Sequence, residues 1–283
     1  MSIIFFICNF SVFAQDIETP QNSCKSSGKI FVNIQKYLGL NLMADLLGES
    51  LVKGVVKIKT RAERINVNLE IYSALDLILK KIKSFNVNAE KLLVEDVPVE
   101  NIKLSINDPI CIRKKRVLST IRIYSLVRID LNKVNEVINN LPKWEKVFSN
   151  LELPVPPFGD TEISINNISI KIDENGRIDA FAEVRSILKP ESEPLELQFT
   201  GNLATDGKKL VAKNIETEIK DIFTKDSDIG IAFSKFLEDL INPIFNFGKY
   251  EKNGLTIDTV KLSFESNNII FEIESRLLPE IPA

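Results

Sequence analysis

Apolar and polar residues alternate along this 283-residue chain with a period that changes from element to element. Before Gly48, apolar residues recur at helical spacing and predict an amphipathic helix. From Val56 the period becomes two, and the apolar positions change from even to odd numbers near Glu63 and Arg64. Because a strand changes faces only through an extra residue, this pattern predicts one long strand over about 53–72 with a β-bulge there. The apolar residues of the predicted helix before Gly48 are Ile34, Leu38, Leu42, Leu46 and Leu47.

The middle of the chain predicts several strands followed by a capped helix. Ser73 is placed to cap a short helix, and Pro98 to mark a turn between two strands. Asp130 is placed to cap a longer helix, which Pro142 interrupts. Trp144 is expected to be a core residue of this helix, with an interfacial anchor as the alternative. The predicted strands cover about 85–95, 99–107 and 117–129.

The second half of the chain predicts three hairpins. The Asn-Gly pair at 175–176 and the Asp-Gly pair at 206–207 are typical of tight hairpin turns. The segment 99–106 resembles 165–172 and 257–264, because each places two polar residues between apolar positions. Either an internal duplication or the ordinary alternation of strands explains this likeness. The hairpin strands are about 161–172 with 178–188, 195–204 with 208–219, and 255–265 with 269–277.

Helical spacing predicts one further helix over about 229–247, with Asp226 or Asp228 as its cap and Pro243 as an interruption. Long strands with one apolar face need another element to cover that face, and the predicted helices have broad apolar arcs. The predicted fold class is therefore α+β, with a long, twisted antiparallel sheet wrapped around amphipathic helices. Such a wrap leaves an apolar groove suited to a lipid acyl chain, although a fully packed core gives the same pattern. The candidate groove residues are Val67, Leu69, Ile71, Phe233, Phe236, Leu237, Leu240 and Ile244.

Composition narrows the chemistry that the chain can perform. The chain has no histidine, which excludes histidine-based triads, general bases and metal ligands, and three cysteines cannot form a four-thiolate zinc site. The nucleophile-elbow, dinucleotide-binding and P-loop motifs are missing. A net charge of -3 argues against a nucleic-acid partner. We therefore expect no enzyme activity, catalytic residue, metal or cofactor, with a carboxylate-only hydrolase as a lower-ranked alternative.

Two basic clusters are candidates for contact with a membrane surface. Arg113, Lys114, Lys115 and Arg116 lie at a predicted loop, where they could meet anionic lipid headgroups. The other cluster follows the polar face of the long strand. The alternative to membrane contact is that one cluster is an ordinary solvated loop and the other an ordinary polar face of a sheet. The second cluster comprises Lys53, Lys57, Lys59, Arg61 and Arg64.

The beginning of the chain predicts three regions. Residues 1–14 are a candidate cleaved signal segment, 15–29 a flexible leader, and 30–283 a single lipid-binding domain. A mis-assigned start or a disordered tail is the alternative for the first region. We expect no membrane-spanning helix. Cys24 and Cys111 are expected to be free thiols, with pairing in an oxidising compartment as the alternative.

The stretch from Val55 to Ile112, and Asp130-Leu131-Asn132 with the helix after it, resemble the LmeA-like phospholipid-binding family of bacteria. The strand core over 85–94 followed by 99–106 is the most similar part, and the resemblance covers about 34–277. It implies a tubular lipid-binding (TULIP-like) fold, non-enzymatic binding of phospholipid or another acyl lipid, and contact with a peripheral membrane surface. It also implies the periplasm or cell envelope, or the cytoplasmic membrane periphery if no signal is present. A structural or assembly protein with a filled core is the rival function.

Overall fold

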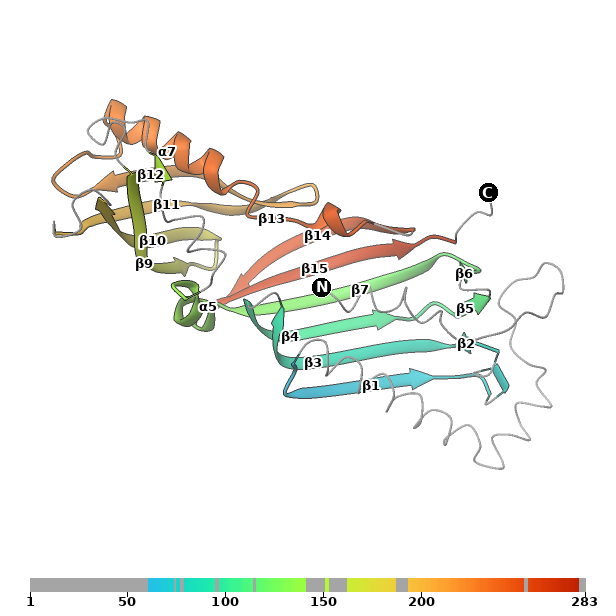
Figure 1. Ribbon diagram of the computed structural model, residues 1–283. Coiled ribbons are helices and arrows are strands. Elements are labelled where there is room, and N and C mark those ends of the chain that lie inside the picture. The colour runs from blue at the N-terminus through green and yellow to red at the C-terminus, as the bar shows by residue number, and fades with distance from the viewer. Residues whose placement is uncertain are drawn as a thin grey trace.

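The computed structural model describes residues 61–73, 75–76, 79–94, 97–113, 116–140, 151–152, 162–186, 193–251 and 254–279. Within these residues the chain is mostly antiparallel β-structure with two α-helices (Figure 1), which confirms the α+β class. The strands form two six-stranded sheets and a small three-stranded sheet, rather than one wrapped sheet. The amphipathic stripe before Gly48, the segment 53–60, Pro142 and Trp144 lie outside the described residues.

The first sheet joins strands from the two ends of the described chain. Strand β7 pairs with β4 on one side and with β15 on the other, so that Ser125 lies opposite both Leu104 and Ile273. The sheet order is β1-β3-β4-β7-β15-β14. Its strands are β1 (Arg64–Glu70), β3 (Ser84–Val94), β4 (Val97–Ile106), β7 (Ile121–Asp130), β15 (Asn268–Leu277) and β14 (Leu255–Glu265).

The second sheet is built from two hairpins and is curled around one side of a helix (Figure 1). Both hairpins confirm the turns predicted from Asn-Gly and Asp-Gly. Gly176 has a φ of +80°, and a Cβ there would lie 2.5 Å from the Phe264 ring, so both conformation and space require glycine. The strands are β8 (Leu151–Glu152), β9 (Glu162–Ile172), β10 (Arg177–Ser186), β11 (Leu195–Asp206), β12 (Lys209–Ile219) and β13 (Phe245–Asn246).

Two of the three similar segments, 165–172 and 257–264, each contain a β-bulge. The strand pairing shifts by one residue in β9 and in β14, so each strand has one extra residue where two polar residues stand together. Asn167 of β9 has a φ of 50°, and Asn214, at the bulge of β12, has a φ of 54°. After a bulge, the apolar residues change between even-numbered and odd-numbered positions, which keeps one face apolar along the whole strand. In 165–172 and 257–264 the pattern therefore marks a bulge, whereas the pairing of 99–106 in β4 with its two neighbours shows no shift in register.

Two α-helices are present in the described residues. Helix α5 (Leu131–Ile138) begins where predicted, and the Asp130 side chain accepts a hydrogen bond from the Asn132 N–H at 2.9 Å. Helix α7 (Asp228–Ile241) is capped by Ser227 instead of either aspartate. It also ends earlier than predicted, because proline at 243 lacks an N–H and cannot continue the helix. The chain after it forms β13 and a 3-10 turn, η1 (Phe247–Tyr250).

A small sheet with the order β2-β5-β6 lies at the end of the first sheet that faces away from the second (Figure 1). The segment before it confirms Ser73 as a cap: the Ser73 hydroxyl accepts from the Asp76 N–H at 3.1 Å and donates to the Asp76 carboxylate at 2.6 Å. The Pro98 prediction is wrong, because Pro98 pairs with Leu93 inside β4. The small strands are β2 (Lys81–Ile82), β5 (Ile110–Arg113) and β6 (Arg116–Val117).

Candidate functional site

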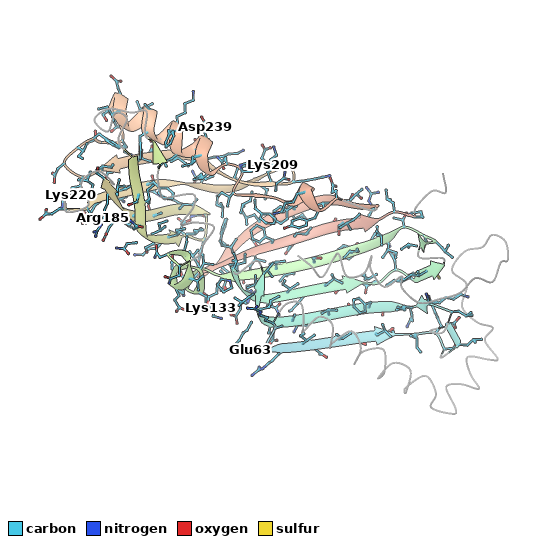
Figure 2. All side chains as sticks on the ribbon, in the orientation of Figure 1. Glu63, Lys133, Arg185, Lys209, Lys220 and Asp239 are labelled. Carbon is cyan, nitrogen blue, oxygen red and sulfur yellow. The ribbon has the colours of Figure 1, made fainter. Side chains whose placement is uncertain are left out.

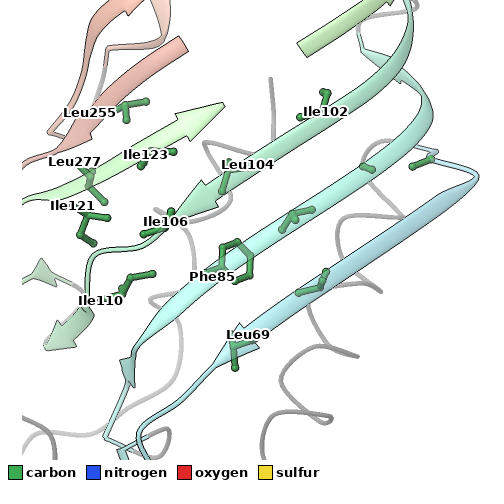
Figure 3. Packing of buried hydrophobic residues seen from close by; sticks show 14 of the residues in the cluster. Leu69, Phe85, Ile102, Leu104, Ile106, Ile110, Ile121, Ile123, Leu255 and Leu277 are labelled. Atoms are coloured by element: carbon green, nitrogen blue, oxygen red, sulfur yellow. The ribbon is translucent and has the colours of Figure 1, made fainter. Parts of the chain in front are cut away.

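One face of the first sheet is apolar across several strands, and we call it the first-sheet apolar face. Figure 3 shows its side chains, with Leu69, Phe85, Leu104 and Ile123 among those labelled, standing on the same side of the sheet. Alternation produces this face, since the intervening residues of β1 and β3 are polar and more exposed. Neither α5 nor α7 contributes a residue to this cluster. The face is made of the inward residues of β1, β3, β4 and β7, among them Val67, Leu69, Phe85, Val87, Leu104, Ile106, Ile121 and Ile123.

The predicted groove residues fall into two separate sets. Val67 and Leu69 are buried on the first-sheet apolar face, with Ile71 partly buried against them. The residues of α7 pack instead against the second sheet, in a cluster that contains no residue of β1. The structure therefore does not bring the two sets together as one groove. Buried Phe233 and Leu237 and partly buried Phe236 and Leu240 belong to the α7 set, and Ile244 lies beyond the helix, 38% exposed.

Helix α7 is fixed to the second sheet by ring packing and by a buried polar network. Phe233 is fully buried and meets Phe223 edge-on, with ring centroids 5.5 Å apart. The Ser234 hydroxyl accepts from the Thr217 N–H at 2.9 Å and donates to the Gly230 carbonyl at 2.7 Å. The Ser234 and Thr217 hydroxyls are also 2.8 Å apart. These bonds satisfy groups that would otherwise be buried without partners.

The apolar interior continues from one sheet to the other through a third cluster. That cluster contains Ile178 and Ala212 from the second sheet and Val260 and Phe271 from the first. Val127 and Ile129 of β7 pack against both this cluster and the first-sheet apolar face, while Ile170 connects it to the cluster under α7. The buried apolar surface is therefore continuous along the molecule.

Asparagine side chains complete the hydrogen bonding along both edges of the second sheet. On β9, Asn135 of α5 accepts from the Ile170 N–H at 2.9 Å and donates to the Ile170 carbonyl at 2.7 Å. Asn139 does the same with Ile168, at 2.7 and 3.1 Å. Asn242, just after α7, binds both backbone groups of Ala212 on β12, at 2.8 and 2.7 Å. The sequence contained a sign of this role, because asparagines four residues apart lie on one face of a helix.

The predicted basic loop corresponds to a hairpin between β5 and β6. Arg113 pairs with Arg116 across this hairpin, while Lys114 and Lys115 lie outside the described residues. Of the strand cluster, Arg61 and Arg64 are exposed, and Arg64 lies 3.9 Å from Glu90. Its three lysines at 53, 57 and 59 lie outside the described residues.

An open hollow of about 400 Å³ adjoins this hairpin. Arg122 and Arg276, which face each other in strand register, line it together with Asp108. Arg122 donates from Nε and Nη2 to the two carboxylate oxygens of Asp108, at 2.9 and 2.8 Å. These hydrogen bonds hold the pKa of Asp108 below its usual range. Because Asp258 pairs with Arg276 in the same way, the charges here are already compensated.

Cys111, a buried residue of β5, is disulfide-bonded, and its partner lies outside the described residues. The expectation of free thiols is therefore wrong for Cys111. The prediction failed because two cysteines far apart in sequence give no indication of their distance in the fold.

The described residues contain no group of three or more cysteine or carboxylate side chains placed to hold a metal ion. Among them, no helix is both long and apolar enough to cross a bilayer. Comparisons with models of protein families, with curated proteins and with solved structures found no match. The resemblance to the LmeA-like family stays a prediction.

Proposed function

We propose that this protein is a non-enzymatic lipid-binding or lipid-transfer protein, and that acyl chains lie against the first-sheet apolar face. The observation that carries the proposal is the extent of that face, which runs across β1, β3, β4 and β7. Among the described residues, neither α5 nor α7 contributes a residue to the cluster on this face. An acyl chain offers the matching chemistry, because an apolar tail packs against apolar side chains and has no polar groups to satisfy.

The dimensions of the face suit an acyl chain. Strand β4 has 10 residues, which span about 33 Å at about 3.3 Å per residue. One bilayer leaflet has a hydrocarbon thickness of about 15 Å, half that of the bilayer core. A lipid tail therefore fits along the strands, and burial contributes about 0.8 kcal/mol for each methylene group.

The proposal places the tail on the first sheet alone. The residues of α7 belong to the cluster on the second sheet, so they serve to pack that sheet in this proposal. A second sheet curled around α7 supports a TULIP-like arrangement, in which sheets enclose helices. The disulfide at Cys111 supports a location in the periplasm or cell envelope, because disulfides persist in oxidising compartments.

The experiment that tests this proposal uses a phospholipid with a photoreactive group in its acyl chain. After uptake and irradiation of the full chain, mass spectrometry should find cross-links in β3, β4 and β7. Uptake without cross-links in these strands would refute the proposed surface. The absence of uptake, together with no lipid co-purifying in native mass spectrometry, would refute lipid binding and favour the assembly role.

A pair of matched variants provides the control. Ala89 lies on the first-sheet apolar face and Ala212 in the cluster between the sheets, and both are fully buried. Ala89→Leu fills part of the proposed surface and should reduce lipid uptake, whereas Ala212→Leu should leave uptake unchanged in the folded fraction. Equal uptake by the two variants contradicts the proposal. Circular dichroism measures the folded fraction of each variant.

A further inference from the structure

Two arginine side chains lie next to each other at one end of the first sheet. Arg122 is the second residue of β7 and Arg276 the last but one of β15, and the strand register places them directly opposite each other. This is the end of the first sheet that faces away from the second sheet (Figure 1). Like charges in such positions destabilise a sheet. The arrangement therefore has a cost unless other groups bind the two guanidinium groups.

Two aspartates hold these arginines from the outer sides. The Asp108 carboxylate accepts from the Arg122 backbone N–H at 2.8 Å as well as from its side chain. Asp258, the extra residue at the bulge of β14, accepts from Nε and Nη2 of Arg276 at 2.8 and 2.6 Å. The four charges balance. Both guanidinium groups are held in fixed orientations by charge-assisted hydrogen bonds, before any ligand binds.

The two arginines keep hydrogen-bond donors that the aspartates do not use. A guanidinium group has five N–H donors, and each aspartate binds only Nε and Nη2. In the part of the chain that the structure describes, neither Nη1 group has a hydrogen-bond partner. The side chains of Arg122 and Arg276 are 63% and 51% exposed, whereas those of Asp108 and Asp258 are 21% and 27% exposed. A solute that approaches this end therefore meets guanidinium groups more than carboxylates.

The open hollow beside these arginines has the size and the lining of a small-anion site. Its volume of about 400 Å³ lies within the range of small-ligand sites, and Ser119 and Thr120 add hydroxyl groups to its lining. The planar fork of arginine matches phosphate geometry. A phosphate group can bind several donors at once through three or more oxygens, whereas a carboxylate has only two oxygens. The donors gathered here therefore fit phosphate best.

We propose that this hollow binds a phosphate group, held by Arg122 and Arg276 with hydroxyl donors from Ser119 and Thr120. The phosphate belongs either to a soluble compound or to the headgroup of a lipid, and the recognition chemistry is the same for both. The proposal goes beyond acyl binding and does not depend on it, because no residue of the hollow belongs to the first-sheet apolar face.

The test is a calorimetric titration of the full chain with inorganic phosphate at constant ionic strength, since salt screens such contacts. Arg122→Gln and Arg276→Gln should each weaken binding roughly tenfold to a hundredfold, the size expected for hydrogen bonds to a charged group. The matched control is Arg128→Gln, on the same face of β7. Arg128 is also paired with a carboxylate, that of Glu265 at 3.2 Å, but it lies opposite Ile270 instead of a second arginine.

A second charge control is Lys220→Gln, at an exposed position at the end of the second sheet that faces away from the first (Figure 2). Both controls should bind phosphate as the unchanged protein does. Thermal unfolding adds a measurement that needs no variant: phosphate should raise the Tm of the unchanged protein above its value in chloride at the same ionic strength. No saturable phosphate binding together with no such rise in Tm would overturn the proposal. A loss for Arg128→Gln as large as those for the two hollow variants would overturn it as well.

A flotation assay then distinguishes the two sources of the phosphate. The vesicles consist of phosphatidylcholine with about one third phosphatidic acid, and excess inorganic phosphate is the competitor. Flotation that phosphate abolishes, and that Arg122→Gln and Arg276→Gln lose, supports the hollow and assigns it a lipid headgroup. Saturable phosphate binding without such flotation supports the hollow and assigns it a soluble compound. Acyl binding is judged separately: lost uptake of the photoreactive lipid by the unchanged protein, with phosphate binding intact, refutes acyl binding alone.

Discussion

The Ser234 hydroxyl joins α7 to β12 by hydrogen bonds, and Ser234→Ala removes it. The Ser234 hydroxyl is the acceptor for the Thr217 N–H and the donor to the Gly230 carbonyl. Thr217 is fully buried and Ser234 is 7% exposed, so water cannot readily take over these bonds. The substitution leaves the Thr217 N–H buried without a protein acceptor among the bonds described.

A buried donor left without a partner costs about 1–3 kcal/mol, and we expect a loss of about 2 kcal/mol in the free energy of unfolding. In a protein of this size, a change of about 1 kcal/mol shifts Tm by roughly 2–4 °C. The predicted decrease in Tm is therefore about 4–8 °C. Thr217→Val should cost less, about 1 kcal/mol, because it retains the N–H that Ser234 accepts.

The assay is denaturant unfolding of the two single variants and the double variant, which form a double-mutant cycle. Because the two hydroxyls lie 2.8 Å apart, the double variant should lose less stability than the sum of the single losses, by about 0.5–1.5 kcal/mol. Ser169→Ala, at an exposed position of β9, is the control and should change little. A loss below about 0.5 kcal/mol for Ser234→Ala, or strict additivity, would refute the reasoning.

Three further predictions concern stability. Gly230→Ala should destabilise the protein by several kcal/mol in denaturant unfolding, since its Cβ would lie 2.2 Å from the Thr224 carbonyl oxygen, and wild-type stability would contradict that close approach. Leu104→Ala should cost about 2–5 kcal/mol in the same assay, because Leu104 is 1% exposed, and a loss under about 1 kcal/mol would show that the face is loosely packed. Asp108 has a lowered pKa in the folded protein, so its pairing with Arg122 stabilises above about pH 4 and is lost as pH falls through the folded pKa. The loss caused by Asp108→Asn should therefore be larger at neutral pH than at about pH 3, and equal losses at both would refute this link.

The local elements were predictable because they depend on neighbouring residues. Alternation identified the strands, glycines after Asn or Asp identified two turns, and Asp130 identified the start of a helix. The end of α7 was not predicted, since Ile244 and Phe245 continue the helical spacing beyond it. Those apolar residues are accommodated differently in the structure, where Phe245 packs edge-on against Phe247 at 4.7 Å.

The candidate site was only partly predictable, because long-range strand pairing decides which apolar residues meet. The pattern showed that Leu69 and Leu237 each face an apolar environment, and both are buried. It contained no information that β7 lies between β4 and β15, the pairing that defines the first sheet. The sequence pattern therefore predicted that the two residues line one groove, whereas in the structure they belong to different clusters.

The asparagines that bind the edges of the second sheet have a consequence for self-association. A primary amide carries the donor and acceptor of a peptide group. Asn135, Asn139 and Asn242 therefore each make the pair of hydrogen bonds that a residue of a neighbouring strand would otherwise make. A strand edge without such a cover is a template for another chain. In the second sheet, three individual side chains thus occupy backbone groups that another strand could otherwise bind. Exchange of one of them for leucine would take away the side-chain partner of those backbone groups and leave them open to a strand from another chain.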